Sequence, residues 1–407
     1  MVEISKSGFG AGLGEATSPG YSTGLQGIQA GNKREVRKMT GERIVLFHPH
    51  IPLTSAAKMS ETLSTRWIGQ GPKVSLFEEK FAERFSGGRP SVAVGSGTDA
   101  LHLAYLLAGV GEGDEVITPV FTCTATNIPL LYERANPVFA DVQSDTLNVD
   151  PAHVKSLITA KTKAIVCVHY GGLPCDMKEL RAIADERRIP IIEDAAHAVG
   201  ATYRGVCIGQ LSEFTMFSFQ AIKHITTGDG GMLVLSDHGL RAKAERIRWF
   251  GIDRSAKLQG IWENDIREVG YKYQMTDIAA TLGLAALDEY EETLAHRRRL
   301  FACYETELQG ILGLRFLGGG YKDREHAAWM CTVSVERRRD LQAKLRDYQI
   351  ESDQVHYRND RYSIFGSRRS NLPNMDAIED KYLVLPLHTK MKEADVQHVC
   401  DTIRSGW

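Results

Sequence analysis

Residues 215–235 read TMFSFQAIKHITTGDGGMLVL, and no other stretch of the chain says as much about its fold. Two apolar runs, Thr215–Phe219 and Met232–Leu235, have the composition of buried strands. Between them stand Lys223 and a Gly-rich turn, so the lysine follows a buried strand closely. An amine in a confined, partly dry site has a lowered pKa and becomes nucleophilic enough to form a Schiff base. A typical lysine is solvated and inert, and Lys223 taken alone favours that bland interpretation.

Five further apolar runs precede this stretch and read as strands. They are Ser91–Val94, Glu115–Thr118, Pro137–Asp141, Ala164–His169 and Pro190–Glu193. Helical patterns alternate with them, and Met177–Arg187 carries its apolar residues at helical spacing. This alternation predicts βαβ units, and hence an α/β fold with a mainly parallel central sheet flanked by helices.

Pattern and composition divide the chain into three predicted parts. Residues 1–41 are rich in Gly and Ser with little apolar periodicity, which predicts a flexible N-terminal extension. Residues 42–300 form the predicted large α/β domain, which includes a helical stretch through Thr276–Arg299. The strand pattern restarts near Met330–Val335, so residues 301–407 are predicted to form a smaller C-terminal α+β domain.

The overall composition is that of an ordinary globular protein. Of 407 residues, 43% are hydrophobic and 25% are charged, and the net charge of −2 points to neither nucleic acid nor an anionic membrane as a partner. No apolar run approaches the roughly 18 residues that would span a bilayer. The N-terminus lacks the pattern of a signal peptide, so we expect a cytoplasmic location.

The cysteines and histidines predict no metal site. Seven cysteines form no CxxC pair, which favours reduced thiols over a disulfide framework or a zinc site. His48 and His50 flank Pro49 without a carboxylate-rich partner, so we interpret the pair as structural. His169 ends a predicted strand, and a satisfied buried histidine is favoured there over a substrate contact.

A first constellation around the lysine stretch is Gly95–Ala100 (GSGTDA), which follows the strand Ser91–Val94 and opens a helix. Small residues let an anion approach the backbone, and a helix start offers unpaired N–H groups and a positive dipole end. The alternative is a Gly-rich turn in which Thr98 or Asp99 serves as the N-cap. The two interpretations are evenly balanced from these residues alone.

A second constellation is Ile191–His197 (IIEDAAH), where an apolar strand ends in two carboxylates. Open α/β sheets bind ligands at the carboxyl ends of their strands. A carboxylate there, such as Asp194, can pair with the protonated ring nitrogen of a cofactor. The alternative is that Asp194 only caps a following helix.

In this order, the three constellations resemble the DegT/DnrJ/StrS sugar aminotransferases, which have the fold-type I architecture and depend on pyridoxal 5'-phosphate (PLP). The resemblance runs from Arg43 to the C-terminus. It includes Trp67–Pro72, Gly113–Ile117, Thr162–His169, Gly270–Tyr273, His356-Tyr357 and Leu385–Leu387. It implies transfer of an amino group from an amino-acid donor, glutamate, to a nucleotide-linked keto-sugar, by a homodimer with shared active sites.

The resemblance also implies roles for individual residues. Lys223 would form the Schiff base with PLP and carry protons in transamination, while Asp194 would pair with the pyridine nitrogen. His197 stands where the family often has Gln and would bind the phenolic oxygen or a substrate group. Three residues would hold the phosphate: Gly97, Thr98 and Ser218.

Two positions depart from the family pattern. Cys123 stands where relatives usually carry an aromatic residue that stacks on the PLP ring, so stacking there is weaker or supplied elsewhere. Lys272 stands where an Asn commonly reaches the phosphate from the partner subunit. A lysine can bind phosphate as a point charge.

Two alternative functions remain open from the sequence. Related sugar dehydratases often replace the Schiff-base lysine with histidine; here Lys223 is retained and His224 is out of register, which favours transfer. A PLP-binding regulatory protein on the same fold is the second alternative, because a fold does not fix a function.

Overall fold

The computed structural model describes residues 43–263 and 265–407. The N-terminal extension predicted over residues 1–41 therefore lies outside the described residues. Within the described ranges, no helix combines the length and the apolar character needed to cross a membrane.

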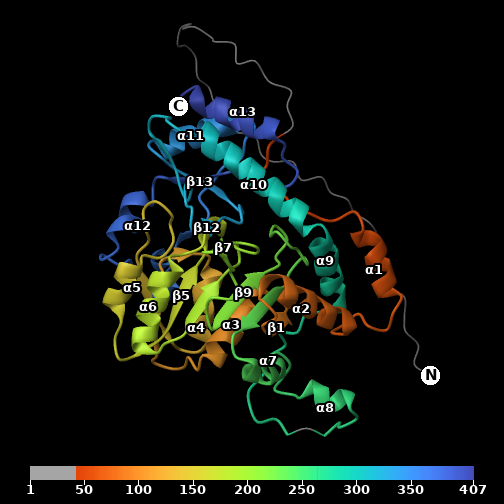
Figure 1. Cartoon of the computed structure of the whole chain (residues 1–407). Helices are drawn as coiled ribbons and strands as arrows, with labels where there is room; N and C mark the ends of the chain where they lie inside the picture. Colours follow the sequence, from red (N-terminus) through yellow and green to blue (C-terminus); the bar gives the residue numbers. More distant parts are fainter. Residues whose placement is uncertain (1–42, 264) are drawn as a thin grey trace, which may run out of the picture. The chain divides into compact units, whose positions relative to one another are not determined.

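A seven-stranded sheet forms the centre of the described structure (Figure 1). Its strands follow the order β1-β10-β9-β6-β5-β2-β4. In this sheet only β10 is antiparallel to its neighbours, so the predicted mainly parallel sheet is confirmed. The bounds are β1 Ser91–Val94, β2 Glu115–Pro119, β4 Asn136–Ala140, β5 Thr162–Val168, β6 Ile191–Asp194, β9 Phe214–Ser218 and β10 Gly231–Leu235.

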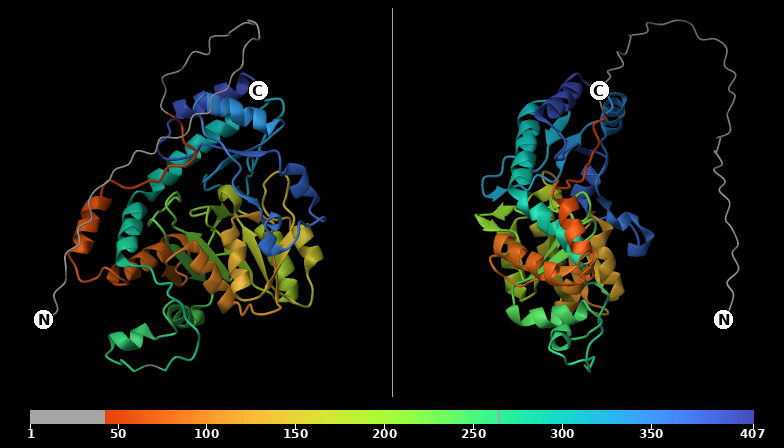
Figure 2. Two further views of the ribbon diagram at one scale, coloured as in Figure 1. Left: turned by 180° about the vertical axis from the view of Figure 1, so that it is seen from behind. Right: turned by 90° about the vertical axis from the view of Figure 1, so that its right-hand side faces the viewer.

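Helices cover both faces of this sheet, as the apolar strands require (Figure 2). Side chains alternate along a strand: Ala93 of β1 belongs to one apolar core, whereas Val92 and Val94 belong to the core on the opposite face. The first core includes α2 (Pro72–Phe85), α5 (Pro151–Leu157), α6 (Met177–Arg187) and α9 (Asp277–Asp288). The second includes α3 (Gly97–Leu107) and α7 (Arg241–Ile247).

Element bounds predicted from the sequence agree closely with the structure in the large sheet. Ser91–Val94 and Met177–Arg187 have the predicted bounds, and the other predicted strands differ by at most two residues at either end. The helical stretch predicted through Thr276–Arg299 consists of two helices, α9 and α10 (Tyr290–Glu307), separated at Glu289. Tyr290 donates a hydrogen bond to the carbonyl of Val199 at 2.8 Å, so a tertiary contact holds the start of α10.

A second, three-stranded antiparallel sheet lies in the C-terminal part of the chain. Its strands are β11 (Leu314–Phe316), β13 (Cys331–Val335) and β15 (Tyr382–Leu385). They share an apolar core with α11 (Arg338–Asp347), α13 (Glu393–Arg404) and the part of α10 from Leu300 onward. The predicted division at residue 300 falls inside α10, and the assignment of residues 42–300 and 301–407 to two domains stays a prediction.

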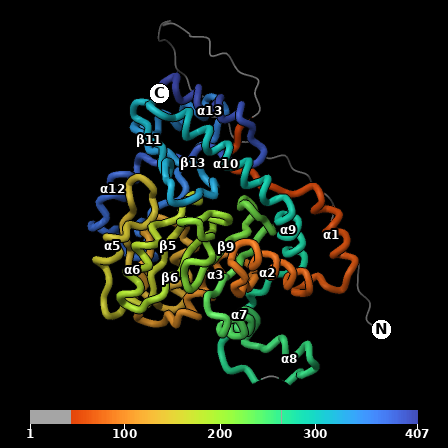
Figure 3. The backbone as a smooth tube through the Cα atoms, in the orientation of Figure 1, coloured from red at the N-terminus to blue at the C-terminus, as the bar shows by residue number. Residues whose placement is uncertain are grey.

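The C-terminal chain also returns to the large sheet (Figure 3). There β14 (Tyr357–Arg358) pairs with β3 (Phe121–Thr122), and the backbone N–H of Asn374 donates to Asp141 after β4 at 2.8 Å. The remaining strands, β12 (Arg324–Glu325), β7 (Thr202–Tyr203) and β8 (Val206–Cys207), form a small sheet. The remaining helices are α1 (Ser55–Leu63), α4 (Thr124–Tyr132), α8 (Arg254–Leu258), α12 (Pro373–Ile378) and the short 3₁₀ helices η1 (Tyr170–Gly172), η2 (His238–Leu240), η3 (Asn359–Arg361) and η4 (Ser363–Phe365).

Candidate active site

The predicted site residues gather at the carboxyl ends of three parallel strands. The turn Gly95-Ser96 follows β1 and leads into α3, Asp194 is the last residue of β6, and Ser218 is the last residue of β9. Because β6 and β9 are paired in parallel, with Asp194 opposite Met216, their carboxyl ends lie at the same edge of the sheet. Ligands bind at this edge in open α/β sheets.

The start of α3 forms a close-packed cradle against β9 and β10. A Cβ added at Gly97 would lie 3.1 Å from the Cβ of Ser218, which shows that these two residues touch. A Cβ added at Gly231 would lie 2.4 Å from the carbonyl oxygen of Ser96, so only glycine fits at Gly231. The first N–H groups of a helix have no acceptor within the helix. Together with the Ser218 hydroxyl, they give this cradle the donors that a phosphate requires.

The N-cap of α3 is Ser96, whereas the sequence analysis named Thr98 or Asp99 for that position. Ser96 has the extended backbone of an N-cap, with φ −157° and ψ 163°, and its hydroxyl accepts from the backbone N–H of Asp99 at 3.0 Å. Thr98 therefore lies inside the first turn of α3, and its side chain does not cap the helix.

Asp194 is buried and held by two hydrogen bonds. The Thr126 hydroxyl donates to Oδ2 at 2.7 Å, and the Ala196 backbone N–H donates to Oδ1 at 3.1 Å. Burial raises the pKa of Asp194, and these two bonds together with nearby Lys223 partly offset that rise. A turn follows Asp194 where the alternative interpretation required a helix, so Asp194 is not a helix cap.

Lys223 lies in the turn after β9 and is half-buried. Burial lowers the pKa of its amine from 10.5 to about 8; Asp194 and Cys123 oppose this shift, and the guanidinium of Arg297 adds to it. Its Nζ lies 3.7 Å from the ring centroid of Trp329. Lys223 thus combines a nucleophilic amine with a confined setting, as its place after a buried strand suggested.

His197 is buried, and its ring stacks on that of Trp329 with 3.9 Å between centroids. Burial and the nearby Lys223 hold its pKa well below 6.5, so the imidazole is neutral at pH 7. The Gly171 backbone N–H approaches Nδ1 at 3.3 Å, which makes Nδ1 an acceptor and assigns the proton to Nε2. His197 can therefore donate one hydrogen bond from Nε2.

The two departures from the family pattern have different surroundings. Cys123 precedes α4 and lies near enough to Lys223 to affect its pKa. Lys272 is exposed, and its Nζ lies 5.2 Å from the ring centroid of Phe250. The next residue in the chain, Tyr273, accepts from the Gly95 backbone N–H at 2.7 Å, so the Lys272 segment runs beside the cradle of the same chain.

The other histidines singled out in the sequence have partners in the protein. His169 is buried, its Nε2 lies 2.8 Å from Glu193 Oε2, and its Nδ1 accepts from the Cys175 backbone N–H at 3.0 Å, so the predicted satisfied histidine is confirmed. His50 contacts Glu289 at 3.0 Å. Among the residues that the structure describes, no cluster of three or more His, Cys, Asp or Glu has the arrangement of a metal site.

Three residues near Lys223 and Asp194 escaped the sequence analysis. Thr126 stands in the segment Phe121–Thr126 that contains Cys123, but its bond joins α4 to Asp194 at the end of β6, 68 residues further along the chain. Arg297 and Trp329 follow Lys223 in the chain by more than seventy residues. Nothing in the sequence around either residue indicates that it lies at the site.

Comparison with known proteins gives a consistent result. A sequence profile described as the DegT/DnrJ/EryC1/StrS aminotransferase family matches residues 51–404. Spore coat polysaccharide biosynthesis protein SpsC of Bacillus subtilis is 35% identical over 371 residues, covering 88% of this chain and 95% of SpsC. GDP-perosamine synthase of Escherichia coli O157:H7 is 32% identical, covering 88% of this chain and 97% of that protein.

Solved structures of sugar aminotransferases have the same fold. The sugar aminotransferase CalS13 from Micromonospora echinospora is 36% identical with a TM-score of 0.85, covering 89% of this chain and 100% of that one. The PLP form of the putative sugar aminotransferase Spr1654 from Streptococcus pneumoniae is 29% identical with a TM-score of 0.84, covering 89% of this chain and 98% of that one.

Proposed function

The chain belongs to the DegT/DnrJ/EryC1/StrS aminotransferase family, and from this premise we propose that it transfers an amino group from glutamate to a nucleotide-linked keto-sugar. It is a PLP-dependent sugar aminotransferase. One observation carries the proposed chemistry: the half-buried amine of Lys223, with a pKa of about 8, lies close to the carboxylate that ends β6.

The residues at this edge fit PLP. The cradle of Gly97, Thr98 and Ser218 would hold the phosphate, since a side chain at Gly97 would close the approach to Ser218. Asp194 would pair with the ring nitrogen, because its two oxygens are already oriented by Thr126 and Ala196. When bound, PLP supplies an electron sink that stabilises negative charge on the carbon that carries the amino group.

Two side chains would bind the substrate side of the cofactor. His197 would donate from Nε2 to the phenolic oxygen, since its other ring nitrogen already accepts from Gly171. Cys123 would lie against the ring in place of an aromatic residue. Burial raises the pKa of Asp194, and a protonated ring nitrogen beside it would favour the charged carboxylate.

Lys223 would carry the proton in both half-reactions. A base works best when its pKa is close to the working pH, and a pKa of about 8 meets that condition for the Lys223 amine. An exposed lysine, with a pKa near 10.4, would hold only about one part in 2,500 of its amine as free base at pH 7. Burial is therefore what makes Lys223 usable as a base.

The sugar and the assembly are further parts of the proposal. The name of GDP-perosamine synthase supports a nucleotide-linked sugar as the acceptor. Exposed apolar side chains on two segments, including Leu53, Ile68, Leu258 and Trp262, support a second copy of the chain as a partner. In that homodimer, Lys272 and residues 67–71 would reach the active site of the other subunit; the cytoplasmic location stays a prediction from the sequence.

A single mixing experiment tests the proposed reaction. Purified PLP-loaded protein mixed with glutamate should lose the visible absorbance of the lysine-bound cofactor and release one equivalent of 2-oxoglutarate. A dehydratase that needs no amino donor, or a regulatory protein, would release none and would contradict the proposal. A screen of nucleotide-linked keto-sugars read by mass then identifies the acceptor, through the mass change of replacing a carbonyl oxygen by an amine.

A further inference from the structure

Trp329 lies in the segment before β13, and it is buried with 1% of its surface exposed. Its indole N–H donates to the carbonyl of Ile222, the residue before Lys223, at 3.2 Å. Its ring stacks on Phe47 near the start of the described chain, with 5.3 Å between centroids, as well as on His197. The indole is thereby fixed by contacts with three segments that are far apart in the sequence.

The amine of Lys223 rests on this fixed ring, with Nζ 3.7 Å from the centroid. An ammonium within about 6 Å of an indole centroid is attracted by the negative face of the ring, and the attraction grows when the site is dry. Because so little of Trp329 is exposed, its ring offers no free face for stacking on a sugar. The ring can therefore act at the site through its contact with the Lys223 amine.

We propose that Trp329 is a positioning residue for Lys223: its indole holds the free amine in place whenever the amine is not bonded to the cofactor. This inference rests on the proposed role of Lys223. In the half of the cycle that begins with the aminated cofactor, Lys223 must be free and must stay close to the carbon whose proton it moves. A rigid aromatic surface keeps the flexible lysine chain there without a salt bridge that would fix its charge.

The charges around Lys223 agree with this role. Asp194 on β6 and Cys123 before α4 favour the ammonium, and Arg297 on α10 disfavours it. The neighbouring imidazoles are uncharged at pH 7, since burial holds the pKa of His356 at about 3 and those of His197 and His224 well below 6.5. Asp194 is the strongest charge influence on the amine, and the indole of Trp329, 3.7 Å from Nζ, is the aromatic surface on which the amine rests.

The test measures the protonation of Lys223 in protein that is not turning over. The full-length chain is loaded with pyridoxamine phosphate, which leaves the lysine free, and is labelled with traces of acetic anhydride over a range of pH. Peptide mass spectrometry gives the labelling midpoint of Lys223, with exposed Lys161 as the internal reference. The protein is produced with tryptophan or with tryptophan carrying one, two or four fluorine atoms on the ring, because fluorine weakens the negative face and changes the shape little.

We expect the Lys223 midpoint to fall stepwise with each added fluorine, by about half to one pH unit over the series. The matched control is Trp329→Phe produced with the same fluorinated residues. Fluorine on the other four tryptophans should leave its Lys223 midpoint unchanged. Two results would overturn the proposal: a Lys223 midpoint in the native chain that does not change with fluorination, or a midpoint that falls by the same amount in Trp329→Phe.

A second readout separates this inference from the proposed function. Lys223 labelling requires no sugar acceptor and no turnover, so a failed sugar screen leaves the result intact. If Lys223→Ala kept the visible absorbance of the bound cofactor, the proposed role of Lys223 would fail, whatever the fluorine series showed. Melting temperatures of all the variants distinguish a change at Lys223 from a general loss of packing.

Discussion

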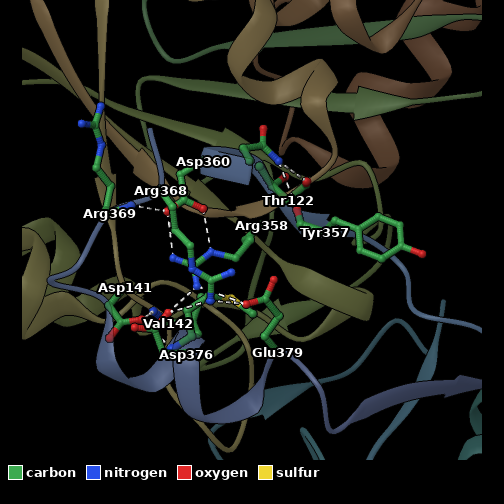
Figure 4. Close-up of polar contacts among 12 residues, drawn as sticks. Thr122, Asp141, Val142, Tyr357, Arg358, Asp360, Arg368, Arg369, Asp376 and Glu379 are labelled. Carbon is green, nitrogen blue, oxygen red and sulfur yellow. Dashed lines mark hydrogen bonds and ion pairs between the residues drawn. The ribbon is translucent and has the colours of Figure 1, made fainter. Parts of the chain in front are cut away.

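Two cationic side chains, the half-buried Lys223 and the buried Arg358, have opposite electrostatic surroundings. The Arg358 side chain is fully buried between β14 and α12, and it faces three carboxylates, Asp360, Asp376 and Glu379 (Figure 4). Asp360 accepts from its Nε at 2.6 Å and from its Nη2 at 2.8 Å. These carboxylates raise the pKa of Arg358 above its ordinary value although burial lowers it, so the side chain stays charged at neutral pH.

Lys223 has the reverse balance. One carboxylate, Asp194, stands against burial and against Arg297, and the pKa of the amine falls to about 8. Arg297 itself donates to backbone carbonyls, among them Leu387 at 3.0 Å, and burial lowers its pKa to about 10. A buried cation with full compensation is a structural part, whereas one with partial compensation can exchange its proton near neutral pH. Two causes make this difference: a guanidinium starts from a higher pKa than an amine, and three carboxylates surround Arg358 whereas one lies near Lys223.

Removing the reactive cation should have the largest effect. Lys223→Ala should abolish both the visible absorbance of the bound cofactor and all transamination, because it removes the amine that we propose bonds the cofactor and moves the proton. The fold should survive, because the change removes a half-buried side chain whose charge is costly to bury. Absorbance measures cofactor bonding, the glutamate assay measures transamination, and circular dichroism measures the fold. Turnover near the unmutated rate would contradict the proposed role of Lys223.

Neutralising the one carboxylate beside Lys223 comes next. Asp194→Asn should leave the cofactor able to bind but slow the glutamate half-reaction on the order of a hundredfold or more, because the ring nitrogen loses its charged partner. The loss of Asp194 should also lower the pKa of Lys223, since this carboxylate favours the ammonium. If Asp194 only stabilised the turn that follows β6, the substitution would lower the free energy of unfolding by roughly 1 kcal/mol and leave the rate of the glutamate half-reaction unchanged.

The matched change in the compensated network should affect stability and spare the chemistry. Asp360→Asn leaves Arg358 buried with weaker partners, which costs about 3 kcal/mol of the free energy of unfolding. Denaturant titration measures that cost, and the pH dependence of the cofactor absorbance should stay as in the native chain. A shifted absorbance midpoint would mean that Arg358 and Lys223 are electrostatically coupled. That result would contradict our assignment of a structural role to the one and a chemical role to the other.

Subunit mixing tests whether a third cation, Lys272, completes the site from the partner. Lys272→Ala should weaken cofactor binding roughly tenfold or more through the loss of one charged phosphate contact. Mixed with Lys223→Ala subunits, it should regain activity, since a heterodimer then carries one site free of both changes. No regain, with subunit exchange verified and Lys272→Ala inactive alone, would refute the sharing of Lys272.

The last prediction concerns Cys123, the cysteine near Lys223. Cys123→Phe should weaken cofactor binding, because overpacking a site shaped around cysteine costs about 1–3 kcal/mol. A stacked aromatic ring would instead contribute on the order of 1 kcal/mol. Titration of the apo-protein with PLP decides between them, and markedly tighter binding at unchanged melting temperature would contradict our expectation.

Local rules explain why the meeting of the predicted site residues at one edge of the sheet was predictable. The order of strand, turn and polar residue places Gly97, Asp194 and Ser218 at strand ends, and parallel pairing then brings those ends together. The same rules missed that Ser96 caps α3, because Ser, Thr and Asp all suit an N-cap and only the backbone angles distinguish them. They also missed the break at Glu289, where the contact of Tyr290 with Val199 overrides a continuous helical pattern.

The sequence by itself determined the α/β sheet and the bounds of the large sheet's strands to within two residues. These follow from side-chain periodicity and short spacings, which act over a few residues. The family resemblance singled out Lys223 as the lysine proposed to react. Only the tertiary structure decided how reactive that lysine is. Trp329, Arg297 and Phe47 reach the site from distant segments, and a pKa depends on burial and charge in space, which the order of residues in the chain does not record.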